Sequence, residues 1–179
     1  MRNNSAINQR CKEMVLVYLS APIIHKGSRK DEFCIHVLNL LEEQGLTVFA
    51  PQFLGPAEPE EIYRRDVYNV RMCDCLLAEV SNPSLGVGME IMLAIELVKP
   101  VLMFYNGEIE SLSRMVRGSD CKVLIQYKSL EDVKKKLLSH NLENLIVQKC
   151  PVCDSQVAEV IEEDLKCVGC GSGGHQVKV

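Results

Sequence analysis

The chain has 179 residues, of which 47% are hydrophobic, and its formal net charge at pH 7 is −4. This length suits one domain of ordinary size with a small addition, and the apolar fraction is sufficient for a buried core. The scattered basic residues argue against a nucleic-acid-binding face. The apolar runs are far shorter than the roughly 20 residues of a membrane helix. Residues 1–13 are polar and lack a signal-peptide centre, so we expect a soluble, cytoplasmic protein without a membrane partner.

After the lead-in at residues 1–13, strand and helix patterns alternate through residues 14–146. Short β-branched or aromatic runs predict five strands, at 14–19, 46–50, 75–80, 101–105 and 122–127. Helical spacing predicts helices between them, at 31–44, 60–73, 88–98, 112–116 and 129–140. This alternation indicates an α/β fold with a doubly wound parallel five-stranded sheet and right-handed crossovers.

Several local patterns refine these helices. Capping-box patterns at 28–31 and 129–132 predict two helix starts, and Gly45 predicts a helix end. The segment 88–98 is almost wholly apolar, so we expect a helix that is buried on most sides. The run 134–136 of three lysines is typical of a solvated helix face.

The segment from Asp74 to Pro100 holds the turn around which the chain can be organised. An apolar strand leads through a turn into a helix that Gly86 and Gly88 open. The free N–H groups and the dipole at a helix start favour an anion, and glycines let a ligand approach the backbone. Glu90 follows at the mouth of this predicted anion-binding loop. An ordinary glutamate in the first helical turn is the alternative interpretation.

A second carboxylate, Asp66, lies on the apolar face predicted for the helix at 60–73. Tyr63, Val67 and Val70 share this face by helical spacing, while the neighbouring arginines, Arg65 among them, are expected to point elsewhere. A carboxylate on an inward face needs a functional reason. The alternative is an exposed or salt-bridged aspartate.

Residues 147–179 are predicted to form a separate zinc ribbon. Of the nine cysteines, four form two Cys-x-x-Cys pairs, which are Cys150, Cys153, Cys167 and Cys170. This spacing is typical of a tetrahedral zinc site, and the segment between the pairs can form a hairpin. A site closed by four thiolates has no open position, so we expect structural zinc, with a redox dithiol as the weaker alternative. Cys34, Cys73 and Cys75 lie in apolar segments and are expected to pack in the core.

With these residues in place, the sequence resembles the nucleoside 2-deoxyribosyltransferase superfamily, and within it the 2′-deoxynucleoside 5′-phosphate N-hydrolases. The most specific stretch is AEVSNPSLGVGME at 78–90, supported by VYLSAP at 17–22, RRDVYNVRMCD at 64–74 and SRMVRG at 113–118. The resemblance covers about residues 14–138 and implies a flavodoxin-like, Rossmann-type fold. It also implies cleavage of an N-glycosidic bond through a glutamate nucleophile, in homodimers whose subunits share active sites.

The resemblance assigns catalytic roles residue by residue. Glu90 falls at the nucleophile position, and Asp66 at the second carboxylate, which contacts the sugar or assists the leaving base. Tyr18 matches the tyrosine that orients the glutamate. No cofactor is implied for catalysis, and the partner is a small nucleoside or nucleotide.

The same resemblance assigns a phosphate site. Ser84, Gly86 and the adjoining N–H groups, including that of Gly88, match the phosphate-binding loop, and Ser113 matches a serine that reaches the phosphate from the partner subunit. This chain departs from its relatives after the first strand: a serine and an arginine are replaced by residues 22 and 24, a proline and an isoleucine. One hydroxyl and one cation for the phosphate are therefore missing, for which residues 25 and 26, a histidine and a lysine, are candidate substitutes.

The expected activity is hydrolysis of a (2′-deoxy)nucleoside 5′-monophosphate to free base and sugar 5-phosphate through a covalent intermediate on Glu90. One alternative is transfer of the deoxyribosyl group to a second base. Another is hydrolysis of a ribonucleotide such as cytidine monophosphate. A binding module without catalysis, whose zinc ribbon contacts a protein or nucleic acid, is the alternative from a different functional class. Retention of Tyr18, Asp66 and Glu90 together argues against it.

Overall fold

The computed structural model of the chain describes residues 14–23 and 29–176, and side chains to residue 174. The lead-in at 1–13, the capping serine at 28 and the candidate substitutes at 25 and 26 therefore lie outside the described residues. The central strands are β1 Leu16–Ser20, β2 Thr47–Phe49, β3 Cys75–Glu79, β4 Val101–Tyr105 and β5 Lys122–Gln126. The helices are α1 Asp31–Glu43, α2 Pro59–Met72, α3 Leu85–Glu96, α4 Arg114–Gly118 and α5 Leu130–Leu138, with short 3-10 turns at Pro51–Phe53, Ile109–Ser111 and Leu142–Asn144.

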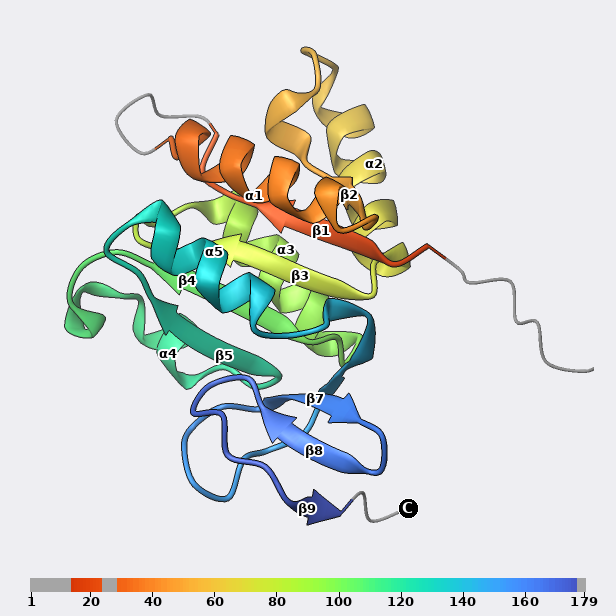
Figure 1. Ribbon diagram of the computed structural model, residues 1–179. Helices are drawn as coiled ribbons and strands as arrows, with labels where there is room; N and C mark the ends of the chain where they lie inside the picture. Colours follow the sequence, from red (N-terminus) through yellow and green to blue (C-terminus); the bar gives the residue numbers. More distant parts are fainter. Residues whose placement is uncertain (1–13, 24–28, 177–179) are drawn as a thin grey trace, which may run out of the picture.

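All five central strands are parallel and follow the order β2-β1-β3-β4-β5 (Figure 1). This order is the flavodoxin-like arrangement, so the predicted fold is confirmed. The chain moves from β1 to one side to form β2 and to the other side to form β3. The carboxyl ends of β1 and β3 therefore flank the topological switch point, where such sheets bind their ligands.

Helices cover both faces of the sheet. On one face α1 and α5 pack against a core that contains Phe33, Val37 and Leu137, and on the other α2 and α3 bury Val70 and Ile91 (Figure 1). The free thiols of Cys34, Cys73 and Cys75 are buried, as predicted. No helix within the described ranges is long and apolar enough to cross a membrane.

Three details of the helices differ from prediction. Lys30, not a serine, is the N-cap of α1, and its side chain makes no capping hydrogen bond. On α2, Tyr63 is 58% exposed, so the predicted apolar face is wrong there. On α3, Leu85 is 91% and Met89 61% exposed, so the prediction of a helix buried on most sides is also wrong for this single chain. The second capping box is confirmed, because Ser129 and Asp132 exchange both capping hydrogen bonds at α5.

The C-terminal part forms a second, antiparallel sheet in the order β6-β7-β8-β9, with β6 Leu145–Val147, β7 Val157–Ile161, β8 Asp164–Cys167 and β9 His175–Gln176. Strands β7 and β8 are the predicted hairpin. Val157 and Val168 are fully buried and belong to the same apolar cluster as Val133 and Leu137 of α5. The ribbon and the α/β domain thus share one core.

A buried polar contact also joins the two parts. Oε1 of Glu159, on β7, accepts a hydrogen bond from the backbone N–H of Asn141 at 2.9 Å. Its other oxygen, Oε2, lies 2.9 Å from Nδ1 of His140. Both side chains are buried. Burial lowers the pKa of His140 despite its bond to Glu159, so the neutral imidazole is favoured and donates from Nδ1.

Replacing Glu159 with alanine should therefore destabilise the chain. Two donors, at His140 and Asn141, would lose their acceptor, and each orphaned buried donor costs about 1–3 kcal/mol. We expect the free energy of unfolding in urea to fall by roughly 2–4 kcal/mol. Glu163→Ala, at an exposed position of the β7–β8 turn, is the matched control, and an equal effect of the two substitutions would contradict the assignment.

Candidate active site and metal site

Glu90 lies in the second turn of α3, where two hydroxyl groups from β1 reach its carboxylate. The hydroxyl of Tyr18 donates to Oε1 at 2.8 Å, and the hydroxyl of Ser20 donates to Oε2. Tyr18 and Ser20 point to the same face of β1 because side chains two apart share a face. Sequence reasoning identified Tyr18 but missed Ser20, although the alternation along β1 places it beside Tyr18.

The environment of Glu90 shifts its protonation. Burial raises the pKa of Glu90 to about 7; the hydrogen bonds from Ser20 and Tyr18 oppose this shift, and the charge of Asp66 adds to it. Burial and the same two carboxylates also raise the pKa of Tyr18, so its hydroxyl stays protonated as a donor. A carboxylate with a strongly shifted pKa at the switch point of the sheet is a functional-site signal.

Asp66 of α2 approaches this site, as its influence on the pKa of Glu90 and Tyr18 indicates. Its Oδ1 accepts from Nε of Arg65 at 2.8 Å, and both side chains are partly buried. The guanidinium carbon of Arg65 also lies 6.0 Å from the centre of the Phe49 ring, which packs on Tyr18 with 5.3 Å between ring centres. The prediction that Arg65 points elsewhere is thus wrong, and Asp66 is both salt-bridged and close to the other carboxylate.

The predicted phosphate loop is the start of α3. Ser84 is the N-cap with an extended backbone, its carbonyl accepts from the N–H of Gly88 at 3.0 Å, and its side chain makes no capping bond. A Cβ added at Gly86 or Gly88 would meet nothing within 4 Å. The helix start is therefore open on the side of the missing side chains, and the Ser84 hydroxyl makes no hydrogen bond that would cap α3 within the described residues. An anion would be stabilised there by the first N–H groups of α3.

Two other predicted residues stand apart from this cluster. Ser113 is exposed, precedes α4, and makes no hydrogen bond to Ser84 or Glu90 in the described part of the chain. Pro22, two residues after β1, is buried. The single chain thus brings together Tyr18, Ser20 and Glu90 by hydrogen bonds, with Asp66 close by, but does not bring Ser113 to them.

The family model for nucleoside 2-deoxyribosyltransferase matches residues 17–149. The chain belongs to this family. A Thermofilum pendens protein, whose name assigns it to the 2′-deoxynucleoside 5′-phosphate N-hydrolases, is 34% identical over 68% of this chain and 91% of its own length. The 5-hydroxymethyl-dUMP N-hydrolase of Danio rerio is 38% identical over 47% of this chain and 60% of its own length.

Solved structures with the same fold include enzymes that act on nucleosides or nucleotides. The CMP N-glycosidase of Clostridium botulinum has a TM-score of 0.57 at 21% identity, covering 70% of this chain and 99% of that one. A 2-deoxyribosyltransferase from Bacillus psychrosaccharolyticus has a TM-score of 0.54 at 21% identity, covering 67% of this chain and 90% of that one. At these identities the likeness supports the deoxyribosyltransferase fold, and not the substrate.

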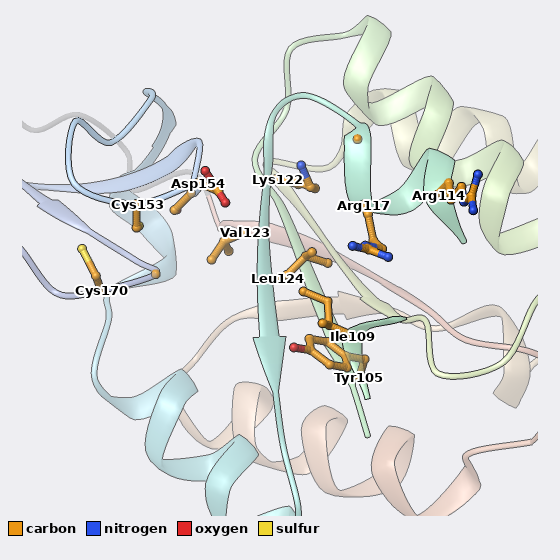
Figure 2. A pocket seen from close by; sticks show the side chains of 13 residues that line it. Tyr105, Ile109, Arg114, Arg117, Lys122, Val123, Leu124, Cys153, Asp154 and Cys170 are labelled. Atoms are coloured by element: carbon orange, nitrogen blue, oxygen red, sulfur yellow. The ribbon is translucent and has the colours of Figure 1, made fainter. Parts of the chain in front are cut away.

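A cavity among the described residues lies apart from the carboxylate cluster. This cavity of ≈860 Å³ is lined by residues of both the α/β domain and the ribbon. Figure 2 shows Tyr105, Arg114 and Arg117 on one side of it and Cys153 and Asp154 on the other. Neither Glu90 nor its partners line it. We locate the candidate active site by its convergent hydroxyls and carboxylates rather than by cavity volume.

The four ribbon cysteines converge as the spacing predicts. Their sulfur atoms lie within 4.8 Å of one another, with 3.8 Å between Cys150 and Cys170 and 3.6 Å between Cys153 and Cys167. Four sulfurs at about 2.3 Å from a tetrahedral Zn²⁺ would be about 3.8 Å apart, so the donor set fits this ion. A Cβ at Gly169 would come within 2.8 Å of Ser155 and 3.2 Å of the Cys153 sulfur, so the close packing of the cluster requires glycine there. The family match ends at residue 149, so the four-cysteine cluster lies outside the part of the chain that matches the family.

One expectation about the ribbon surroundings needs correction. Lys136 does not face solvent like its neighbours. It is partly buried, and its ammonium donates to the carbonyl of Gly169 at 3.3 Å. The lysine run at 134–136 is therefore only partly a solvated face.

Proposed function

We propose that this chain hydrolyses the N-glycosidic bond of a (2′-deoxy)nucleoside 5′-monophosphate, with Glu90 as the nucleophile. The observation that carries the proposal is the carboxylate of Glu90, held at the switch point of the sheet by hydrogen bonds from Tyr18 and Ser20. Family membership and the names of the relatives, which are N-hydrolases acting on nucleotides, support the reaction class.

The residues account for both halves of a retaining mechanism. The ionised Glu90 attacks C1′ while the C1′–N bond breaks. The electron pair of the broken bond leaves with the base, which takes up a proton. Asp66 assists the departing base or binds a sugar hydroxyl. Water then attacks C1′, releases the sugar 5-phosphate and restores the Glu90 carboxylate. Tyr18 and Ser20 hold Glu90 in place, and the open start of α3 at Ser84 and Gly86 receives the phosphate.

A homodimer with shared active sites is part of this proposal. Its support is the apolar surface of α3 and α4, where Leu85 is 91%, Met89 61%, Met92 47% and Met115 80% exposed. Exposed apolar clusters of this kind mark interaction sites. A second chain seated on this surface would cover it and could bring its Ser113 toward the phosphate. We place the enzyme in the cytoplasm, where its nucleotide substrates and reduced cysteines are found, with zinc as a structural ion in the ribbon.

The direct test is a panel of nucleosides and nucleotides with and without the 2′-hydroxyl and the 5′-phosphate, followed by chromatography for free base. We expect release of base from 5′-monophosphates, and the ribose and deoxyribose members identify the sugar. Family membership makes base transfer the second candidate. Adding a free acceptor base separates the two, because a new nucleotide product would show transfer. Tight binding without release of base from any member would identify a binding module and contradict the proposal.

The pKa of Glu90 makes a separate prediction about pH. Only the ionised carboxylate is a nucleophile, so activity should rise with pH through about 7. Removing a hydrogen bond that favours ionisation should raise this pKa further. For Tyr18→Phe we expect the acid limb of kcat/KM to move upward by about one unit, with a roughly tenfold loss at pH 6.5.

The matched control is Tyr105→Phe, since the Tyr105 hydroxyl makes no hydrogen bond to the described residues. Its pH profile should equal that of the unmodified chain. An acid limb below pH 5 in the unmodified chain, or an unmoved limb in Tyr18→Phe, would contradict the assignment of Glu90 as the titrating group.

A further inference from the structure

A second glutamate, Glu79, is fully buried at the end of β3, and the proposed mechanism does not use it. Neighbouring side chains of a strand point to opposite faces of the sheet, and Ala78 points to the face that holds Glu90. Glu79 therefore points to the other face, which α1 and α5 cover. Burial raises the pKa of Glu79. Placing a carboxylate in the core costs several kcal/mol unless other groups compensate, so its contacts indicate why it is there.

Glu79 connects the ends of three neighbouring strands. Its Oε1 accepts from the hydroxyl of Ser81 and, at 3.0 Å, from the hydroxyl of Tyr127, which follows β5. The Ser81 oxygen accepts in turn from the N–H of Asn106, which follows β4, at 2.8 Å. The Asn106 side chain donates to the carbonyl of Tyr127 at 2.9 Å, which closes the network. Lys30, at the start of α1, places its ammonium 4.0 Å from the same Oε1.

The direction of these bonds requires an acceptor at residue 79. The Asn106 N–H can only donate, so Ser81 receives that bond and directs its single proton to Glu79. The Tyr127 hydroxyl donates to the same oxygen. The other oxygen, Oε2, finds no hydrogen-bond partner among the described residues. One oxygen of Glu79 therefore carries the network, and a glutamine could present the same oxygen.

Ser81 begins the turn that leads to α3. Three residues later Ser84 caps that helix, whose first turn forms the open anion site and whose second turn carries Glu90. Ser81 is held to the end of β4 by Asn106 and, through Glu79, to the end of β5 by Tyr127. These bonds determine where the turn starts. We propose that Glu79 is a positioning residue, which holds Ser81 and thereby places the phosphate-binding start of α3; this inference rests on the proposed function.

The test compares Glu79→Ala and Glu79→Gln in the full chain, with Ser81→Ala and Tyr127→Phe as milder changes in case Glu79→Ala does not fold. Glu79→Ala removes the acceptor of the network, and Ser81→Ala and Tyr127→Phe each remove a donor. Glu79→Gln keeps the acceptor. For Glu79→Ala and Ser81→Ala we expect KM for the nucleoside 5′-monophosphate to rise about tenfold, as the loss of one well-placed hydrogen bond predicts. KM for the same nucleoside without phosphate should change much less, and Glu79→Gln should restore most of the loss.

Tyr105→Phe is the matched control for Tyr127→Phe, because its hydroxyl lies outside the network; it should leave KM unchanged. A lowered unfolding midpoint with unchanged KM in Glu79→Ala would overturn the inference, since Glu79 would then only stabilise the fold. Equal losses in Glu79→Ala and Glu79→Gln would also overturn it, because the acceptor would not be what matters.

Hydrogen exchange separates this inference from the proposed function. Backbone amides of residues 82–88 should exchange faster in Glu79→Ala and Ser81→Ala than in the unmodified chain or Tyr105→Phe. This readout needs no turnover. If exchange is faster in the two variants but the unmodified chain releases no base, the positioning role stands and the proposed reaction is refuted. Unchanged exchange in both variants would refute the positioning role.

Discussion

Glu90→Gln should abolish release of base while leaving the fold intact. The amide keeps the shape of the side chain but cannot attack C1′, and loss of a nucleophile lowers kcat by roughly 10³- to 10⁶-fold. Because burial raises the pKa of Glu90 to about 7, ionising this group opposes folding at pH 8. The neutral variant should therefore be at least as stable as the unmodified chain at that pH, and the difference should shrink toward pH 5.

Initial rates of base release, with urea unfolding at pH 5 and pH 8, measure both expectations. The matched control is Glu96→Gln, an exposed glutamate on the same helix, which should retain full activity. Mass spectrometry of the acid-quenched unmodified chain should find the sugar phosphate on the peptide that contains Glu90. Residual activity of Glu90→Gln above one tenth of normal would contradict the nucleophile assignment.

Removing the metal should be the most damaging change to stability. The ribbon has a small sheet, and the four-cysteine site is expected to supply the binding energy that such a unit lacks, on the order of 10 kcal/mol in zinc peptides. Because Val157 and Val168 complete the core beside α5, loss of the ribbon structure should uncover Val133 and Leu137. We expect chelation, or Cys153→Ser, to lower the unfolding temperature of the whole chain and to increase binding of an apolar dye.

Elemental analysis of the purified chain gives the identity of the ion and its ratio to protein, for which we expect one zinc. Cys121→Ser is the control, since Cys121 lies outside the cluster and its sulfur makes only a long contact, to the carbonyl of Ile95, among the described residues. A chain that holds no metal and unfolds at the same temperature after chelation would contradict the prediction and favour the dithiol interpretation.

The sequence predicted the architecture well because strand signals in a parallel sheet are local. Each of the five strands is a short apolar run, and the predicted bounds agree with the structure within two residues, with β4 matching at both ends. The start of α3 was predicted three residues late, since two glycines argue against a helix by propensity, yet Ser84 caps it and Leu85 begins it. The convergence of the four cysteines could also be predicted, because each Cys-x-x-Cys pair is a pattern within a short stretch of sequence.

Other features depend on contacts between distant segments, which no local pattern contains. Ser20 falls just after the strand predicted at 14–19, and its bond to Glu90 depends on where α3 lies relative to β1. Arg65 was expected to point away, but its pairing with Asp66 and its position over Phe49 arise where α2 meets β2. The apolar outer side of α3 was assigned to the core because composition does not distinguish a buried face from an exposed one.

The shared core has a consequence for how the chain matures during translation. Helix α5 emerges from the ribosome well before Val157 and Val168, the side chains that complete the cluster beside Val133 and Leu137. The family domain therefore cannot finish packing when its own last element has been synthesised. Its final consolidation waits for the ribbon to emerge and close over α5, so a nascent chain halted near residue 149 would still expose part of its interior.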